Sequence, residues 1–140
     1  MESLELYTLE ALHRFIEKEL DDSISIPKLR PIYREIRGKY FAMSLEDLDM
    51  YIELDNHEYR VIGSWCIDRV HEEATKDLVS ECYFTETNLD KLWWIKIDWT
   101  ATSNTLIEED GYAHMFATYD HNEYEFDMDN RSTLYFFRTN

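Results

Sequence analysis

The sequence predicts an α+β domain, with two N-terminal helices followed by a mainly antiparallel meander sheet of about five to six strands. Helical spacing of apolar residues is clearest before residue 40, and apolar–polar alternation dominates after residue 41. The length of 140 residues suits one domain with a modest core. We therefore expect a single domain over residues 1–140, with a helical part at 1–40 and a sheet-rich part at 41–140.

The N-terminal helices are predicted from apolar spacing and from capping residues. Residues 3–20 carry apolar side chains three and four positions apart, and Ser3 is a suitable N-cap. A short second helix is expected to begin near Pro31 and to end at Gly38. Proline favours the first turn of a helix and glycine favours its end.

Alternating apolar and polar side chains predict the strands. Residues 48–67 form a predicted hairpin around a turn at 55–58. Residues 69–82 fit either a helix or a continued strand, and the spacing of their apolar residues favours the helix. Four further strands are expected, at residues 92–102, 112–119, 123–129 and 133–138.

Composition excludes several classes of function. The chain has 30 Asp and Glu against 14 Lys and Arg, a formal net charge of −16, which opposes direct binding to nucleic acid or to an anionic membrane. The glycines, Gly38, Gly63 and Gly111, are too far apart for a phosphate-binding loop, and no histidine spacing matches a metal motif. We therefore expect no enzymatic activity, no cofactor and no metal site.

The N-terminal segment and the cysteines indicate a compartment. The first 25 residues are charged throughout, so they predict no signal peptide, and no apolar run reaches the length of a membrane span. Cys66 and Cys82 are expected to be free thiols, because the absence of an export signal favours a reducing environment. These features predict a cytoplasmic protein.

The acidic residues are unevenly distributed. Residues 1–40 hold 8 acidic and 7 basic side chains, whereas residues 41–140 hold 22 and 7. Within the predicted strand 123–129, carboxylates alternate with apolar side chains, so they form a row on one face of the sheet, spaced roughly 6.5–7 Å apart. This row is Glu123, Glu125, Asp127 and Asp129, and a second acidic run, expected in a loop, is Glu108, Glu109 and Asp110.

The predicted second helix has the opposite charge. Five bases surround the single acid Glu35: Lys28, Arg30, Arg34, Arg37 and Lys39. We expect these bases to attract acidic residues within the fold.

Solvation of an antiparallel sheet is the simplest explanation of the acidic row. A solvated face normally mixes charges, however, because like charges on neighbouring strands repel each other. We therefore favour a surface directed at a basic partner. Trp94, which shares a predicted strand face with Lys96 and Asp98, or Tyr124 would provide an apolar anchor.

The favoured function is a non-enzymatic acidic inhibitor that occupies the basic, nucleic-acid-binding surface of a protein partner, a nuclease or a nucleoprotein effector. In size, charge and aromatic-rich sheet the chain resembles the acidic phage- or plasmid-encoded DNA mimics with anti-restriction or anti-CRISPR activity. It also resembles the immunity proteins that neutralise nuclease toxins. No family motif supports either resemblance.

Two other classes remain open at this stage. The first is a cystatin-like or nuclear transport factor 2-like fold with an apolar ligand pocket. Its candidate lining residues are Trp65, Trp99, Phe116 and Tyr135. The second is an assembly subunit that pairs with its own copy.

Overall fold

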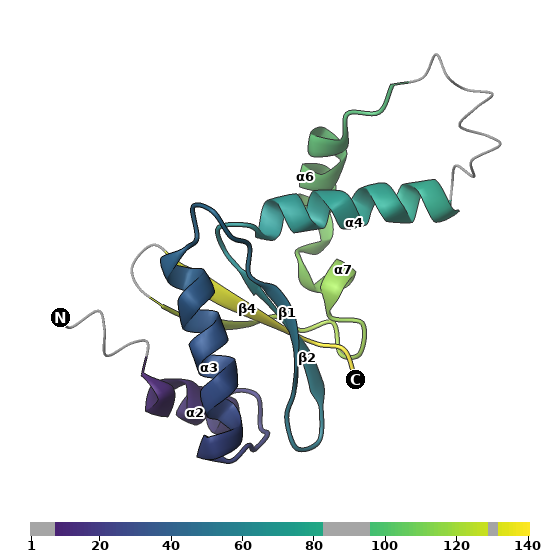
Figure 1. Ribbon diagram of the computed structural model, residues 1–140. Helices are drawn as coiled ribbons and strands as arrows, with labels where there is room; N and C mark the ends of the chain where they lie inside the picture. The colour runs from purple at the N-terminus through teal and green to yellow at the C-terminus, as the bar shows by residue number, and fades with distance from the viewer. Residues whose placement is uncertain (1–7, 83–95, 129–131) are drawn as a thin grey trace.

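The computed structural model describes residues 8–82, 96–128 and 132–140 and has an α+β fold (Figure 1). Its four strands are antiparallel throughout, in the order β1-β2-β4-β3. The predicted class is confirmed, but the described residues form four strands rather than five to six. The elements are α2 (Leu9–Lys18), α3 (Ile26–Phe41), β1 (Asp49–Glu53), β2 (Glu58–Gly63), α4 (Ile67–Cys82), α6 (Trp99–Asp110), α7 (Ala113–Phe116), β3 (Tyr124–Asp127) and β4 (Thr133–Arg138).

One face of the sheet packs against α2 and α3, which lie together on one side of the strands in Figure 1. Val61 of β2 pairs with Phe136 of β4, and both side chains are fully buried on this face. The helices contribute a matching apolar stripe to the same cluster, namely Leu12, Ile16, Leu29 and Ile36. Burial of these side chains is the main stabilisation of this half of the fold.

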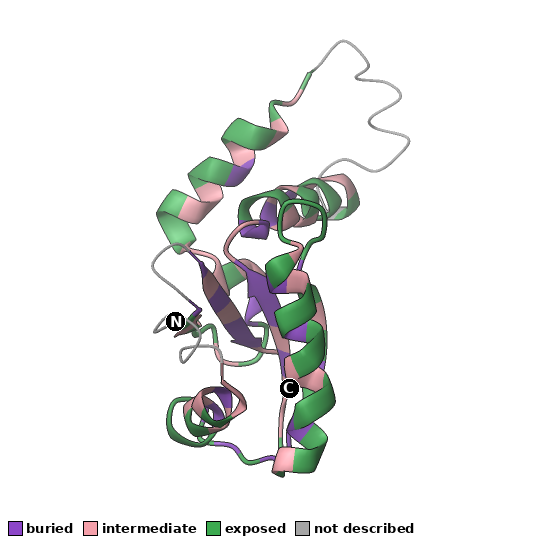
Figure 2. Ribbon diagram, turned by 60° about the vertical axis from the view of Figure 1, so that its left-hand side comes forward, coloured by how far each residue is buried: buried purple, intermediate pink, exposed green. Residues whose placement is uncertain are grey.

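The opposite face carries a second apolar cluster. Ile62 and Phe137, the next residues along the two central strands, are also fully buried. They pack with Ile67 at the start of α4 and with Phe116 of α7. Figure 2 shows the result, with buried positions in the strands and exposed positions on the outer sides of the helices. Both faces of the central strands are therefore covered.

Helices α4 and α6 pack against each other beyond one end of the sheet (Figure 1). Cys66, just before α4, is a buried free thiol, as expected, and burial raises its pKa. No helix within the described ranges is long and apolar enough to cross a lipid bilayer.

The N-terminal helices differ in extent from the prediction. Thr8 has an extended backbone and caps α2 by accepting a hydrogen bond from the Ala11 N–H at 3.1 Å, so the helix does not run through residue 8. Residues 3–7 lie outside the described residues. Helix α3 begins before Pro31 and continues past Gly38, because the apolar stripe that packs on the sheet extends to Tyr40.

The hairpin and the helix that follows it are confirmed. Strands β1 and β2 pair around the predicted turn, although β2 ends at Gly63 because the chain turns there to enter α4. The preference for a helix over residues 69–82 was correct, since α4 covers them. Strand β4 has the predicted bounds, and β3 occupies residues 124–127 of the predicted strand 123–129.

Two predicted strands are wrong where the structure describes them. Residues 99–102 of the predicted strand 92–102 begin α6, because the Asp98 side chain caps a helix by accepting from the Ala101 N–H at 3.0 Å. The predicted strand 112–119 contains the short helix α7 and turns. Local hydrogen bonds at the chain reversals outweighed the alternating pattern at both places.

The two glycines Gly38 and Gly63 give a matched test of this packing. A methyl group added at Gly63 would lie 2.7 Å from the Trp65 indole, whereas Gly38 has open space around it in the last turn of α3. We expect Gly63→Ala to lower the free energy of unfolding by about 1–3 kcal/mol through overpacking. Gly38→Ala should raise it by up to about 1 kcal/mol through helix propensity. Urea denaturation measures both, and equal effects would contradict this account.

Candidate partner-binding surface

Strand β3 is an edge strand that carries the predicted row of acids. Tyr124 and Phe126 are half-buried, whereas the flanking Glu123, Glu125 and Asp127 are exposed. The predicted alternation is therefore present over these residues. Asp129, the last acid of the predicted row, lies outside the described residues.

The β3 acids gather around one tyrosine of the neighbouring strand. Glu125 pairs directly with Tyr135 of β4 across the sheet. Burial raises the pKa of the Tyr135 hydroxyl, and four carboxylates raise it further, those of Glu125, Glu123, Asp68 and Asp127. The fourth acid comes from α4 rather than from the strand. The pKa of Tyr135 is therefore raised by two acids of β3, by Glu123 just before the strand and by one helical acid.

A second tyrosine completes this surface. Tyr112, just before α7, donates a hydrogen bond of 2.5 Å to Asp68 Oδ1, and its ring centroid lies 5.5 Å from that of Tyr135. Both tyrosines are half-buried. We call this surface the acidic patch: the carboxylates of Asp68, Glu123, Glu125 and Asp127 with the rings of Tyr112 and Tyr135.

The acidic patch lacks compensating cations within the described part of the chain. None of the ion pairs between described residues includes one of its four carboxylates. Two nearby arginines on α4 and β2 are already paired elsewhere, Arg69 with Asp47 and Arg60 with Asp49 at 2.8 Å. The repulsion between the patch carboxylates is therefore not relieved by these groups.

The pKa of Glu123 is raised within the acidic patch. Partial burial, together with a hydrogen bond and the like charge of Glu125, raises the pKa of Glu123 from 4.5 to about 7. Glu123 and Glu125 also line a hollow of about 330 Å³ with Glu19, the residue that follows α2. A cation held beside Glu123 would lower this pKa again, because it would favour the charged carboxylate.

The other predicted site residues lie elsewhere. Glu108, Glu109 and Asp110 are exposed but form the last turn of α6 rather than the expected loop, and α6 packs on α4. Tyr124 faces α2 and α3, where its hydroxyl donates to Asp120 Oδ2 at 3.1 Å. Trp94 lies outside the described residues.

Sequence reasoning missed Asp68, Tyr112 and Tyr135 as members of one site. They come from three separate segments: Asp68 falls between the predicted hairpin 48–67 and the helix favoured over 69–82, and Tyr112 begins the wrongly predicted strand 112–119. The one signal that pointed to Tyr135 was its position beside Glu125, which required the pairing register of β3 and β4.

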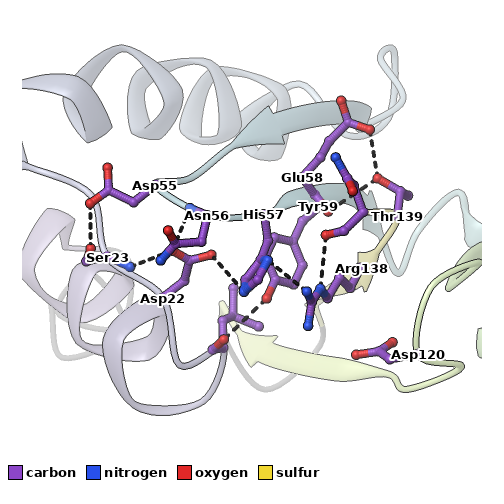
Figure 3. A network of polar contacts seen from close by, with 12 residues as sticks. Asp22, Ser23, Asp55, Asn56, His57, Glu58, Tyr59, Asp120, Arg138 and Thr139 are labelled. Carbon is purple, nitrogen blue, oxygen red and sulfur yellow. Dashed lines mark hydrogen bonds and ion pairs between the residues drawn. The ribbon is translucent and has the colours of Figure 1, made fainter.

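A different polar network joins the chain reversals (Figure 3). The buried Asp22 accepts from the Ser23 N–H at 2.8 Å, and its Oδ2 lies 3.9 Å from His57 Nε2. Arg138 donates to His57 Nδ1 at 2.8 Å, so the proton of neutral His57 lies on Nε2 and faces Asp22. These contacts join the α2–α3 connection, the β1–β2 turn and the end of β4, and we interpret the network as structural.

Another buried polar group connects α4 and α6. The Ser103 hydroxyl lies 2.6 Å from His71 Nδ1, and Thr75 donates to the His71 carbonyl at 2.8 Å. Burial lowers the pKa of the His71 ring, which favours its neutral form. Both partners are buried, and the His71 ring packs edge-on against Phe116, so this contact joins the helices.

Metal ligation has no candidate among the described residues. No group of three His, Cys, Asp or Glu side chains in residues 8–82, 96–128 and 132–140 could hold a metal ion. His114 and His121 do meet, with ring centroids 6.2 Å apart in a stacked arrangement, but they form only a pair.

Comparison of the chain with protein-family models, with curated proteins and with solved structures found no match. The chemistry of the acidic patch therefore carries the functional conclusion.

Replacing Glu123 tests the repulsion in the acidic patch. Because folding raises the pKa of this carboxyl from 4.5 to about 7, the folded state binds more protons between these values, and the wild-type free energy of unfolding falls as pH rises through them. Glu123→Gln should remove this pH dependence. It should raise the free energy of unfolding at pH 8 by at most about 1 kcal/mol, because the group is exposed. Glu125→Gln should reproduce part of the gain. Urea denaturation at pH 5 and pH 8 measures the effect, and parallel pH profiles for wild type and Glu123→Gln would contradict it.

Replacing Asp22 tests the structural network. Asp22→Ala should lower the free energy of unfolding by about 2 kcal/mol, because the Ser23 and Asn56 N–H groups lose their acceptor. Asp55→Ala removes only an exposed hydrogen bond to the Ser23 hydroxyl and should cost less than about 1 kcal/mol. Thermal denaturation compares the two variants, and a larger loss for Asp55→Ala would refute the assignment.

Proposed function

We propose that the protein is a non-enzymatic inhibitor that binds the basic, nucleic-acid-binding surface of a protein partner through its acidic patch. One observation carries this proposal: four carboxylates surround two half-exposed tyrosines without an ion pair to any described residue. Such a partner is a nuclease or a nucleoprotein effector, and the inhibitor acts as a nucleic-acid mimic.

Relief of repulsion favours a cationic partner. Carboxylates two residues apart on β3 stand roughly 6.5–7 Å from each other, and each can accept a bidentate hydrogen bond from an arginine. Nucleic-acid-binding grooves present arginine and lysine at this density because they contact phosphates. Binding to such a groove replaces like-charge repulsion with attraction.

The tyrosines provide what charge alone does not. Exposed charges mainly increase the association rate and the specificity, whereas aromatic side chains at the centre of an interface contribute most of the affinity. Tyr112 and Tyr135 lie among the carboxylates and their rings are packed against each other, so they are ordered before binding. A partner that closes over the acidic patch therefore meets an apolar centre surrounded by acids.

The net charge of the chain supports rapid association with such a partner. At −16, the molecule attracts a basic surface from beyond contact distance, over about 8 Å at physiological salt. The three acids at the end of α6 add to this field, since no basic residue lies in that turn. We propose that they contribute to steering rather than to the contact itself.

Charge reversal on β3 tests this function. We expect Glu123→Lys, Glu125→Lys and Asp127→Lys together to abolish capture of the partner, because three carboxylates of the patch become cations. The control reverses exposed acids that make no ion pair with a described residue, namely Glu35→Lys, Glu53→Lys and Glu81→Lys. Both variants carry the same net charge, so a difference between them reports on the position of the charges.

The measurement has two stages. Immobilised wild type and variants are incubated with host lysate at low salt, eluted with a salt gradient and analysed by mass spectrometry. The captured protein is then purified and its binding to DNA or RNA is measured in the presence of each variant. Wild type and control should displace the nucleic acid from the captured protein, and the β3 variant should not. Displacement by the β3 variant, or no displacement by any of the three proteins, would overturn the proposal. A captured toxin nuclease would identify immunity, and a restriction or CRISPR effector would identify counter-defence.

A further inference from the structure

Helix α3 carries three exposed arginines on one stripe. Arg30, Arg34 and Arg37 are four and three residues apart, so their side chains point to the same side of the helix. The sequence led us to expect them to pair with acids inside the fold. Of the α3 bases, only Lys39 forms an ion pair with a described residue, to Glu46 at 3.7 Å.

The arginines border a groove between α2 and α3. This groove has a volume of about 570 Å³ and is lined by the three arginines, by one acid, Glu10, and otherwise mainly by apolar and aromatic side chains. Leu9 of α2 and Ile26 and Tyr33 of α3 form its apolar part. We call it the basic groove: a largely apolar floor with a guanidinium rim.

Exposed apolar side chains continue from one end of the basic groove. Phe41, which lines the groove at the end of α3, is 61 % exposed, and the Arg37 guanidinium lies 5.4 Å from the centre of its ring. Leu45, four residues further along, is 89 % exposed. Large apolar side chains this exposed, beside a charged rim, are typical of a protein interface.

The three arginines destabilise helix α3 when no anion is bound in the basic groove. Like charges three and four residues apart each cost a helix a few tenths of a kcal/mol. The first turn of α3 also lacks an acidic residue, which would have favoured the helix dipole. An anion bound along the stripe removes the repulsion between the arginines.

We propose that the basic groove binds an acidic amphipathic helix of a partner protein. The stretch from Arg30 to Phe41 covers about 16 Å of helix, or three turns, which matches a short helix laid along it. Carboxylates at helical spacing on the bound helix would pair with the three guanidiniums, and its apolar stripe would contact the floor and Phe41.

Tyr33 and Phe41 offer rings on which a base can stack, so the choice between a protein and a nucleic acid rests on electrostatics. The net charge of −16 repels the dense charge of a phosphate backbone more strongly than a helix with a few carboxylates, and this favours a protein. The basic groove is separate from the acidic patch, so this inference does not depend on the proposed function.

A peptide-binding experiment with the full chain tests the inference. The probe is a fluorescein-labelled helical peptide of about 15 residues, with glutamates at positions four and three apart on one stripe and leucines on the next. We expect saturable binding by fluorescence anisotropy. Arg30→Glu, Arg34→Glu and Arg37→Glu together should weaken it at least tenfold, and the single changes Arg34→Ala and Phe41→Ala should each weaken it measurably without unfolding the protein.

Matched controls define the outcomes. A variant with exposed bases reversed elsewhere, Arg14→Glu, Lys18→Glu and Lys76→Glu, should bind the probe as wild type does. Absence of saturable binding, or equal loss in both triple variants, would falsify the inference. Tighter binding of a labelled poly-dT oligonucleotide that depends on the same arginines would assign the groove to nucleic acid instead. Self-association in sedimentation that the α3 changes abolish would assign it to a second copy.

Discussion

The constraint on which the whole structure depends is that the two central strands are apolar on both faces. Val61 and Ile62 of β2, and Phe136 and Phe137 of β4, point in turn to opposite sides of the sheet and are all fully buried. One layer of helices can cover only one of these faces. The chain must therefore place α2 and α3 on one side and α4 and α7 on the other, and most acidic side chains lie at the sheet edges, in turns and on the outer helix surfaces, with the buried Asp22 as an exception.

This restriction separates the charges of the molecule. The acidic patch forms where an edge strand, β3, meets the segments that cover the second face, and the basic groove forms where α3 covers the first face. The two surfaces have different chemistry: one has carboxylates around tyrosines, and the other has guanidiniums beside a floor of aliphatic and aromatic side chains. A protein with a large net negative charge thus keeps one surface that suits an acidic partner.

The features that were predicted correctly from the sequence depend mainly on residues that are close in the chain. The β1–β2 hairpin was predicted because its two alternating strands are close in sequence. Strand β4 was predicted because its apolar side chains lie in the core. The carboxylate row on β3 was found for the same reason. Residues 99–102 and 112–119 were assigned to strands wrongly, because alternating apolar residues there compete with a helix cap at Asp98 and with tight turns around Gly111. The Asp68–Tyr112 hydrogen bond joins residues that are 44 positions apart, and no local sequence pattern predicts it.

The sequence by itself determined the α+β class, the helical start, the acidic alternation of β3 and the basic stripe of α3. Each of these follows from periodicity, which is a property of consecutive residues. Only the tertiary structure decided which carboxylates stand together around Tyr135 and whether the α3 arginines find partners. Those outcomes depend on strand order and on the docking of helices distant in sequence, because charges interact through space and the fold sets the distances between them.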